Sequence, residues 1–243
     1  MSPRVLRRLN RRQALSLMGS ASLAGMACAT TPTSPSAGSS APGTTAPGAG
    51  GAATPPVSGT QCAVSPTETV GPFPSLGDYV RRNITDGRPG VPLLLSITVV
   101  NVSAGCAPVP AVMVDVWQCD HEGTYSEYGN GRGQTFLRGM QVTDAQGQVT
   151  FETIYPGWYQ GRATHIHVEV LMGGRSLKVT QIAFPEDITA AVYRTGVYAA
   201  KGQNTTSNAR DNVFSDGVSL QTLTLTGSPS AGFTGTFTVG VAL

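Results

Sequence analysis

Charged residues are scarce in this chain of 243 residues: Asp, Glu, Lys and Arg together make up only 12% of it. Long solvent-exposed helices need charged residues along their outer faces, so this composition argues against a helical protein. The formal net charge of +2 depends on five arginines among residues 1–29, which contain no acid. The rest of the chain has 11 basic and 14 acidic residues, a net charge of −3. Such a balance attracts neither nucleic acid nor an anionic membrane surface, so we expect no nucleic-acid partner.

Cysteine is also scarce, with four copies in the chain. No two of them stand in the close C-x-x-C spacing of a structural zinc site, so the sequence gives no sign of that kind of site. Cys62 and Cys106 are the natural disulfide pair if the protein folds in an oxidising compartment. We expect Cys119 to stay unpaired and buried.

The first 29 residues have the order of an export signal. A basic region that ends in Arg11-Arg12 precedes a moderately apolar stretch, residues 14–29, which is short for a bilayer span. The arginine pair resembles a twin-arginine export signal, although an ordinary secretion signal can contain the same pair. Small residues around Cys28 fit signal cleavage and also, imperfectly, a lipid-attachment site. We therefore predict export, with soluble release and a lipid anchor at Cys28 both open.

Residues 30–61 consist almost entirely of Ala, Gly, Ser, Thr and Pro. Such a tract cannot bury enough apolar surface to offset its chain entropy, so we predict a disordered linker. The folded domain then covers residues 62–243, which is long enough for one substantial hydrophobic core.

Extended segments dominate this domain. Short runs rich in β-branched residues, separated by Gly and Pro, predict strands at 93–102, 111–118, 138–143, 148–154, 165–172, 177–183, 219–226 and 233–241. Asp144 to Gly147 is a turn signal, so the strands on either side of it should form a hairpin. Only Glu186 to Tyr193 has the pattern of a short helix. The fold class is therefore all-β: a β-sandwich of mostly antiparallel strands, with long loops and little helix.

Histidine occurs three times in the chain, and two of the copies stand at His165 and His167. Residues i and i+2 of a strand point to the same face, so both imidazoles can converge on one point. Taken alone, the pair could also be one core and one surface histidine. His121, between two acidic residues, is expected in solvent and not as a ligand.

Two tyrosines extend the histidine pair to a metal site. Tyr159 stands six residues before His165 in a loop with Gly and Pro, and Tyr125 follows another predicted strand. Phenolate oxygen is a hard, strongly donating ligand, which with two neutral imidazoles suits non-haem iron(III). Two tyrosinates and a hydroxide would cancel the +3 charge, so that the site could be buried. An iron(II) site with two histidines and a carboxylate would have to use Glu169.

Six short motifs carry a resemblance to a known family. They are 68–72 (ETVGP), 117–126 (WQCDHEGTYS), 136–139 (FLRG), 151–162 (FETIYPGWYQGR), 165–167 (HIH) and 180–182 (TQI). In this order and spacing they resemble the intradiol ring-cleavage dioxygenases, which include the catechol and protocatechuate dioxygenases. The resemblance covers nearly all of residues 62–243.

The resemblance implies roles for individual residues. It puts Tyr125 and Tyr159 at the two tyrosinate positions and His165 and His167 at the two histidine positions. Tyr159 matches the phenolate that leaves the metal when the diol binds. Arg162 matches the arginine of the active site, where it stabilises charge on the substrate, and Gln181 matches a nearby polar residue. A loop ion pair is the other interpretation of Arg162.

The implied function is a dioxygenase that opens a small aromatic diol with O2 between its two hydroxylated carbons, to a muconate-type diacid. A non-catalytic exported β-sandwich that binds ligands at the surface is the competing hypothesis. A related metal with hydrolytic or redox chemistry is a third. The identity of the diol and the oligomeric state stay open.

Overall fold

The structure is a computed structural model that describes residues 62–243. The predicted export signal at 1–29, the predicted linker at 30–61 and the lipid-anchor candidate Cys28 lie outside the described residues. The strands are β1 (Pro92–Asn101), β2 (Ala107–Pro108), β3 (Met113–Trp117), β4 (Arg138–Val142), β5 (Gln148–Ile154), β6 (His165–Met172), β7 (Arg175–Ala183), β8 (Thr224–Ser228) and β9 (Gly232–Val241). One α-helix, α2 (Glu186–Val192), and the 3-10 helices η2 (Val102–Ala104), η3 (Gly196–Tyr198) and η4 (Asn208–Arg210) complete the described part. None of its helices is long and apolar enough to cross a membrane.

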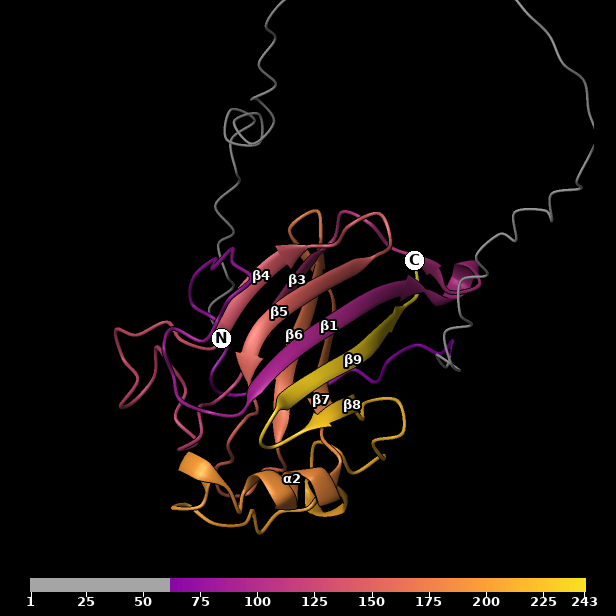
Figure 1. Ribbon diagram of the computed structural model, residues 1–243. Coiled ribbons are helices and arrows are strands. Elements are labelled where there is room, and N and C mark those ends of the chain that lie inside the picture. Colours follow the sequence, from indigo (N-terminus) through magenta and orange to yellow (C-terminus); the bar gives the residue numbers. More distant parts are fainter. Residues whose placement is uncertain (1–61) are drawn as a thin grey trace, which may run out of the picture. The chain divides into compact units, whose positions relative to one another are not determined.

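The strands form two sheets that lie face to face, with α2 at one end (Figure 1). One sheet has the order β2-β1-β9-β8, and β5 also pairs with β1; the other has the order β4-β3-β6-β7. Every pair is antiparallel except β1 and β9, which run parallel. The predicted all-β sandwich of mostly antiparallel strands with little helix is therefore confirmed.

The core lies between the sheets because side chains alternate along each strand. On β6, Ile166 and Val168 point into it and are fully buried. Burying a Val or Ile side chain contributes roughly 1.5–3 kcal/mol. The period of two then turns His165 and His167 to the opposite face. These two imidazoles therefore lie on the outer side of the four-stranded sheet, under the loops that cover it.

The prediction of a hairpin around residues 144–147 is wrong: the turn forms, but the strands on either side of it do not pair with each other. The Gly147 N–H donates to the carbonyl oxygen of Asp144 at 3.0 Å, and the Asp144 side chain accepts from the N–H of Gln148 at 2.8 Å. However, β4 pairs with β3 and β5 pairs with β1, so the turn connects the two sheets. Turn residues fix the reversal of the chain, whereas the partner strand is chosen by long-range packing.

The strand predicted at 219–226 begins later than expected. The N–H groups of Gln221 and Thr222 both donate to the carbonyl oxygen of Val218 at 2.9 Å, which makes a turn. Thr222 then forms an isolated bridge with Ala183, and β8 begins at Thr224. The alternating pattern of this segment is thus interrupted by a turn that holds Gln221 in a fully buried position.

The predicted disulfide between Cys62 and Cys106 is present, with a Cα–Cα distance of 5.7 Å. It ties the beginning of the described chain to the turn between β1 and β2, 44 residues further along. Cys119 is unpaired and buried, as predicted.

Replacing both bridged cysteines, in a Cys62→Ser/Cys106→Ser variant, should lower the free energy of unfolding by about 2–4 kcal/mol. The physical reason is that the unfolded chain gains the freedom of the opened loop. Urea titration of the oxidised protein and of the variant measures the difference. Ala107→Ser, at an exposed neighbouring position, serves as the control. Equal stability of all three proteins would contradict the prediction.

Candidate metal centre

The structure brings together the four side chains that the sequence predicted as ligands. His165 Nε2 lies 3.2 Å from His167 Nε2 and 3.2 Å from the hydroxyl oxygen of Tyr125. The ring of Tyr159 has its centre 5.7 Å from those of Tyr125 and His165. Tyr125 and both histidines are buried, whereas Tyr159 is half-buried. The arrangement gives one point that two nitrogens and two phenolic oxygens can approach.

A row of four residues crosses the outer face of the sheet beneath this point. Arg138, Trp117, His167 and Gln181 stand opposite one another on β4, β3, β6 and β7. The indole of Trp117 lies flat on the imidazole of His167, with ring centres 4.9 Å apart and an angle of 4° between the planes. This stacking fixes the orientation of the ring. The register of three strand pairs therefore places His167.

The two tyrosines come from loops that touch each other. Tyr125 follows β3 and Tyr159 precedes β6. A Cβ atom on Gly157 would lie 2.2 Å from the carbonyl oxygen of Asp120, and one on Gly123 would lie 2.2 Å from that of Trp158. Only glycine allows this close approach. The glycines of both motifs thus bring the two phenols to the same site.

Lys201 joins the same two loops, and sequence reasoning missed it. Its ammonium group donates to the carbonyl oxygens of Glu122 and Trp158 and lies 4.7 Å from the centre of the Trp158 ring. Lysine in a polar loop has no sequence signal for this role. Its contacts can be found only once the fold brings residue 201 near residues 122 and 158.

Both imidazoles are neutral at neutral pH. Burial, helped by the positive charge of Arg162, lowers the pKa of His165 to about 3. Burial also lowers the pKa of His167 well below its ordinary value, and the neighbouring His165 adds to this. The Nδ1 atom of His165 donates to the carbonyl oxygen of Ala163 at 2.6 Å, so its Nε2 carries a lone pair toward the site.

Burial has the opposite effect on the phenols. It raises the pKa of Tyr125 well above its ordinary value and raises that of Tyr159 as well. Desolvation penalises the charged form, so the phenols stay protonated unless a strong positive charge is close. A highly charged cation at the point of convergence would supply that charge.

The donor set fits a metal that accepts tyrosine oxygens. Among residues 62–243 no three His, Cys, Asp or Glu side chains gather into a metal-binding group. Glu169 is the carboxylate that the iron(II) alternative would need. It lies two residues beyond His167 on β6, opposite Asp115 of β3. Within the same part of the chain, Nδ1 of buried His167 has no hydrogen-bond partner. Two neutral imidazoles and two phenols are thus the groups that the site offers.

Arg162 and Gln181 lie beside the four candidate ligands. The guanidinium of Arg162 donates to the Tyr159 oxygen at 3.4 Å and to the amide oxygen of Gln181 at 2.5 Å. Its Nε also donates to Asp211 at 2.9 Å, in a buried ion pair. The two interpretations of Arg162, site residue and loop ion pair, therefore hold together, because the ion pair aims the guanidinium at Tyr159.

Asp211 is a site residue that the sequence did not reveal. It is buried, and besides Arg162 it accepts the N–H of Ala163 at 2.6 Å. An isolated aspartate 49 residues after Arg162 carries no local signal.

Asp211→Asn should lower the free energy of unfolding by about 3 kcal/mol, because the buried charge of Arg162 would lose its partner. Denaturant titration of the variant and the parent protein measures this loss. Asp216→Asn, at an exposed position five residues further on, should change stability by less than about 0.5 kcal/mol. A loss of the same size in both variants would count against a special role for Asp211.

His121, expected in solvent, is half-buried. Its ring packs edge-on against Tyr198, with centres 6.2 Å apart. The reason is its neighbour Asp120, which is fully buried and accepts the N–H groups of Glu122 and Thr124 at 3.0 and 2.9 Å. That tight turn draws His121 inward.

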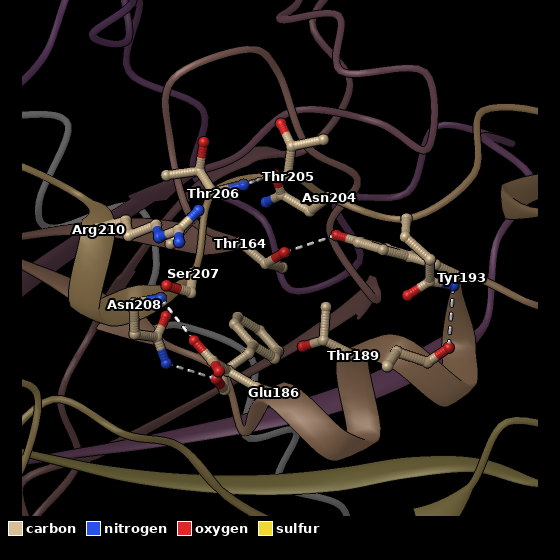
Figure 2. Close-up of a pocket in the computed structure, with 14 residues that line it drawn as sticks. Thr164, Glu186, Thr189, Tyr193, Asn204, Thr205, Thr206, Ser207, Asn208 and Arg210 are labelled. Atoms are coloured by element: carbon tan, nitrogen blue, oxygen red, sulfur yellow. Dashed lines mark hydrogen bonds between the residues drawn. The ribbon is translucent and has the colours of Figure 1, made fainter.

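A separate cavity of about 400 Å³ lies behind the segment that carries Arg162, between α2 and residues 203–210 (Figure 2). None of the four candidate ligands lines it. Its polar groups bind one another: the hydroxyls of Thr164 and Tyr193 lie 2.7 Å apart, and Glu186 accepts the N–H of Asn208 at 2.6 Å. The amide of Asn204 donates to the carbonyl oxygen of Arg162 at 3.0 Å. These bonds brace the far side of the Arg162 segment.

Comparisons with known proteins cover the part of the chain that carries this site. A family model described as Dioxygenase matches residues 74–213. An intradiol ring-cleavage dioxygenase from Tetranychus urticae superposes with a TM-score of 0.70 and 29% identity, over 74% of this chain and 95% of that one. The dioxygenase domain of a dioxygenase carbohydrate-binding protein fusion from Streptomyces sp. SirexAA-E gives 0.57 and 30%, over 74% and 99%. A catechol 1,2-dioxygenase from Candida albicans is 34% identical over 94 residues, which span 31% of its length.

Proposed function

Because this chain belongs to the intradiol ring-cleavage dioxygenase family, we propose that it is a non-haem iron(III) enzyme acting on a catechol-type diol and O2. It opens the aromatic ring between the two hydroxylated carbons and releases a muconate-type diacid. The observation that carries the proposal is the convergence of His165, His167, Tyr125 and Tyr159 on one buried point.

Tyr125, Tyr159, His165 and His167 would hold the iron. When bound, iron(III) acts as a Lewis acid toward the diol, which prepares the ring for attack by O2. The two imidazoles contribute no charge, and two phenolates with a hydroxide balance the +3 charge. A buried site needs such neutrality, because the nearby charges of Arg162 and Arg138 are already paired with Asp211 and Glu127.

Tyr159 is the group proposed to take up a proton from the diol. Of the two tyrosines it is the more exposed, so it is the one that can move away and make room for substrate. Tyr125 is 3% exposed and stays in place. The guanidinium of Arg162, 3.4 Å from the Tyr159 oxygen, stabilises negative charge that develops on the substrate. Gln181 and Asp211 keep that guanidinium in position.

Two observations separate this proposal from a non-catalytic binding module. Purified protein loaded with iron(III) should be burgundy or red-brown, because tyrosinate-to-iron charge transfer gives a broad visible band. It should convert catechol or a substituted catechol to the corresponding muconate, with both atoms of 18O2 in the product. Elemental analysis tests the third hypothesis, another metal. Protein that stays colourless after iron loading and opens no catechol would overturn the proposal.

Tyr159→Phe should shift the visible band and lower kcat by roughly 10²-fold, because both a ligand and a proton acceptor are lost. Tyr198→Phe is the matched control: it also removes one tyrosine hydroxyl, but that hydroxyl donates to the carbonyl oxygen of Tyr155 and accepts the N–H of Val91, outside the candidate centre. It should keep the band and the turnover. Full activity of Tyr159→Phe would remove Tyr159 from the mechanism.

We also propose that the protein is exported. The arginine pair and apolar stretch of residues 1–29 support this, and so does the disulfide between Cys62 and Cys106, a bond typical of oxidising compartments. Fractionation of the cells that express the full chain tests it, with Arg11→Lys/Arg12→Lys to separate the twin-arginine route from ordinary secretion. Intact chain found only in the cytoplasm would contradict export.

A further inference from the structure

Arg138 is the fully buried arginine at one end of the row that crosses the outer face of the sheet. All three of its guanidinium nitrogens are engaged. Nε donates to the Ser126 hydroxyl at 2.8 Å, Nη2 to the Ser126 carbonyl at 2.7 Å and Nη1 to the Phe73 carbonyl at 3.1 Å. A buried cation with this many contacts fixes the groups around it, because each of them would otherwise lose a partner.

The partners of Arg138 are the immediate neighbours of Tyr125. Ser126 is the next residue in the chain, so its two contacts hold the backbone from which the phenol projects. The ring of Phe73 stacks on the Tyr125 ring, with centres 4.8 Å apart and an angle of 27°. One guanidinium therefore fixes Tyr125 both through its backbone and through the ring that covers it.

Residues 69–73, here called the strap, are hydrogen-bonded to the two end residues of the row Arg138, Trp117, His167 and Gln181. The amide of Gln181, at the far end, donates to the carbonyl oxygen of Thr69 at 2.9 Å, and Arg138 binds Phe73. Between these points Gly71 crosses His167 so closely that a Cβ atom there would lie 2.9 Å from its Cε1. Gly71 has φ +70, a backbone conformation that favours glycine. The strap thus packs over both a histidine and a tyrosine of the centre.

Glu127 completes the arrangement. Its carboxylate lies 3.0 Å from Nε of Arg138 and accepts the N–H of Leu76 at 2.9 Å and the hydroxyl of Tyr79. Glu127 has φ +68, in a region that residues with a side chain rarely adopt. The turn after Tyr125 therefore takes a strained form that places the carboxylate against Arg138, two residues beyond the phenol.

We propose that Arg138, with Glu127, is a positioning residue of the metal centre that sets the place of the Tyr125 phenol before metal binds. This inference rests on the proposed function, since it assigns Tyr125 as a ligand. Arg138 touches no reacting atom in this role; it acts through Ser126 and Phe73. Lysine keeps the charge, but its single ammonium cannot reproduce the planar fork that reaches Ser126 and Phe73 together.

The test is Arg138→Lys in the full chain, loaded with iron(III). We expect the visible band to shift and kcat for catechol to fall about tenfold. In a titration buffered by a chelator, half-loading of the variant with iron should need a free-iron concentration at least tenfold higher than that of the parent protein. KM should change much less, because Arg138 is fully buried and so is not open to a diol that enters the site. Arg82→Lys is the matched control: its side chain is 59% exposed and pairs with Glu152. It should behave as the parent protein.

The outcomes separate the inference from the function. A parent protein without a visible band and without turnover refutes the proposed function. A coloured, active parent whose Arg138→Lys variant keeps the band, iron retention and kcat while losing only thermal stability overturns the positioning role. If Arg138→Lys does not fold, Tyr79→Phe removes the outer contact of Glu127 and should shift the band in a folded protein. An unchanged band in that variant would equally overturn the inference.

Discussion

The desolvation of His165 and His167 is the constraint on which the rest of the site depends. Two adjacent imidazoles on one face of a strand can be buried only as neutral rings, because a buried charge without a partner costs several kcal/mol. Both rings are almost fully excluded from water, and His167 is covered by the indole of Trp117 and by the strap at Gly71. Water exclusion in turn demands close packing, which explains the glycines at 71, 123 and 157.

The cations of the site are balanced locally. Arg162 pairs with Asp211, and Arg138 pairs with Glu127, each within about 3 Å. These two ion pairs flank the four candidate ligands without leaving net charge among them. A metal entering such a place meets donors whose only available negative charge is that of the phenols themselves. If the site binds a metal as proposed, this arrangement favours a cation whose charge is high enough to displace the phenolic protons.

Local sequence patterns were sufficient for the features that depend on neighbours in the chain. The period of two placed His165 and His167 on one face, and β6 has the predicted bounds. The disulfide also followed from residue type. What could not be predicted depends on long-range choices. The turn at 144–147 does not reveal that β4 and β5 belong to different sheets. The contact of Asp211 with Arg162 spans 49 residues, and that of Arg138 with Phe73 spans 65.

The parallel pairing of β1 and β9 has a consequence for how the protein folds. Leu93 stands opposite Phe233 and Asn101 opposite Val241, so the central ladder of one sheet joins segments about 140 residues apart. Phe237 and Val239 of β9 belong to the same core that backs the histidine strand. Contacts of such long sequence separation form slowly, because the closure entropy of the long loop is lost before the contacts are gained. The sheet that carries the two histidines, β4-β3-β6-β7, ends at Ala183, but its backing arrives only with β9. The candidate ligands are therefore fixed in a late, cooperative step.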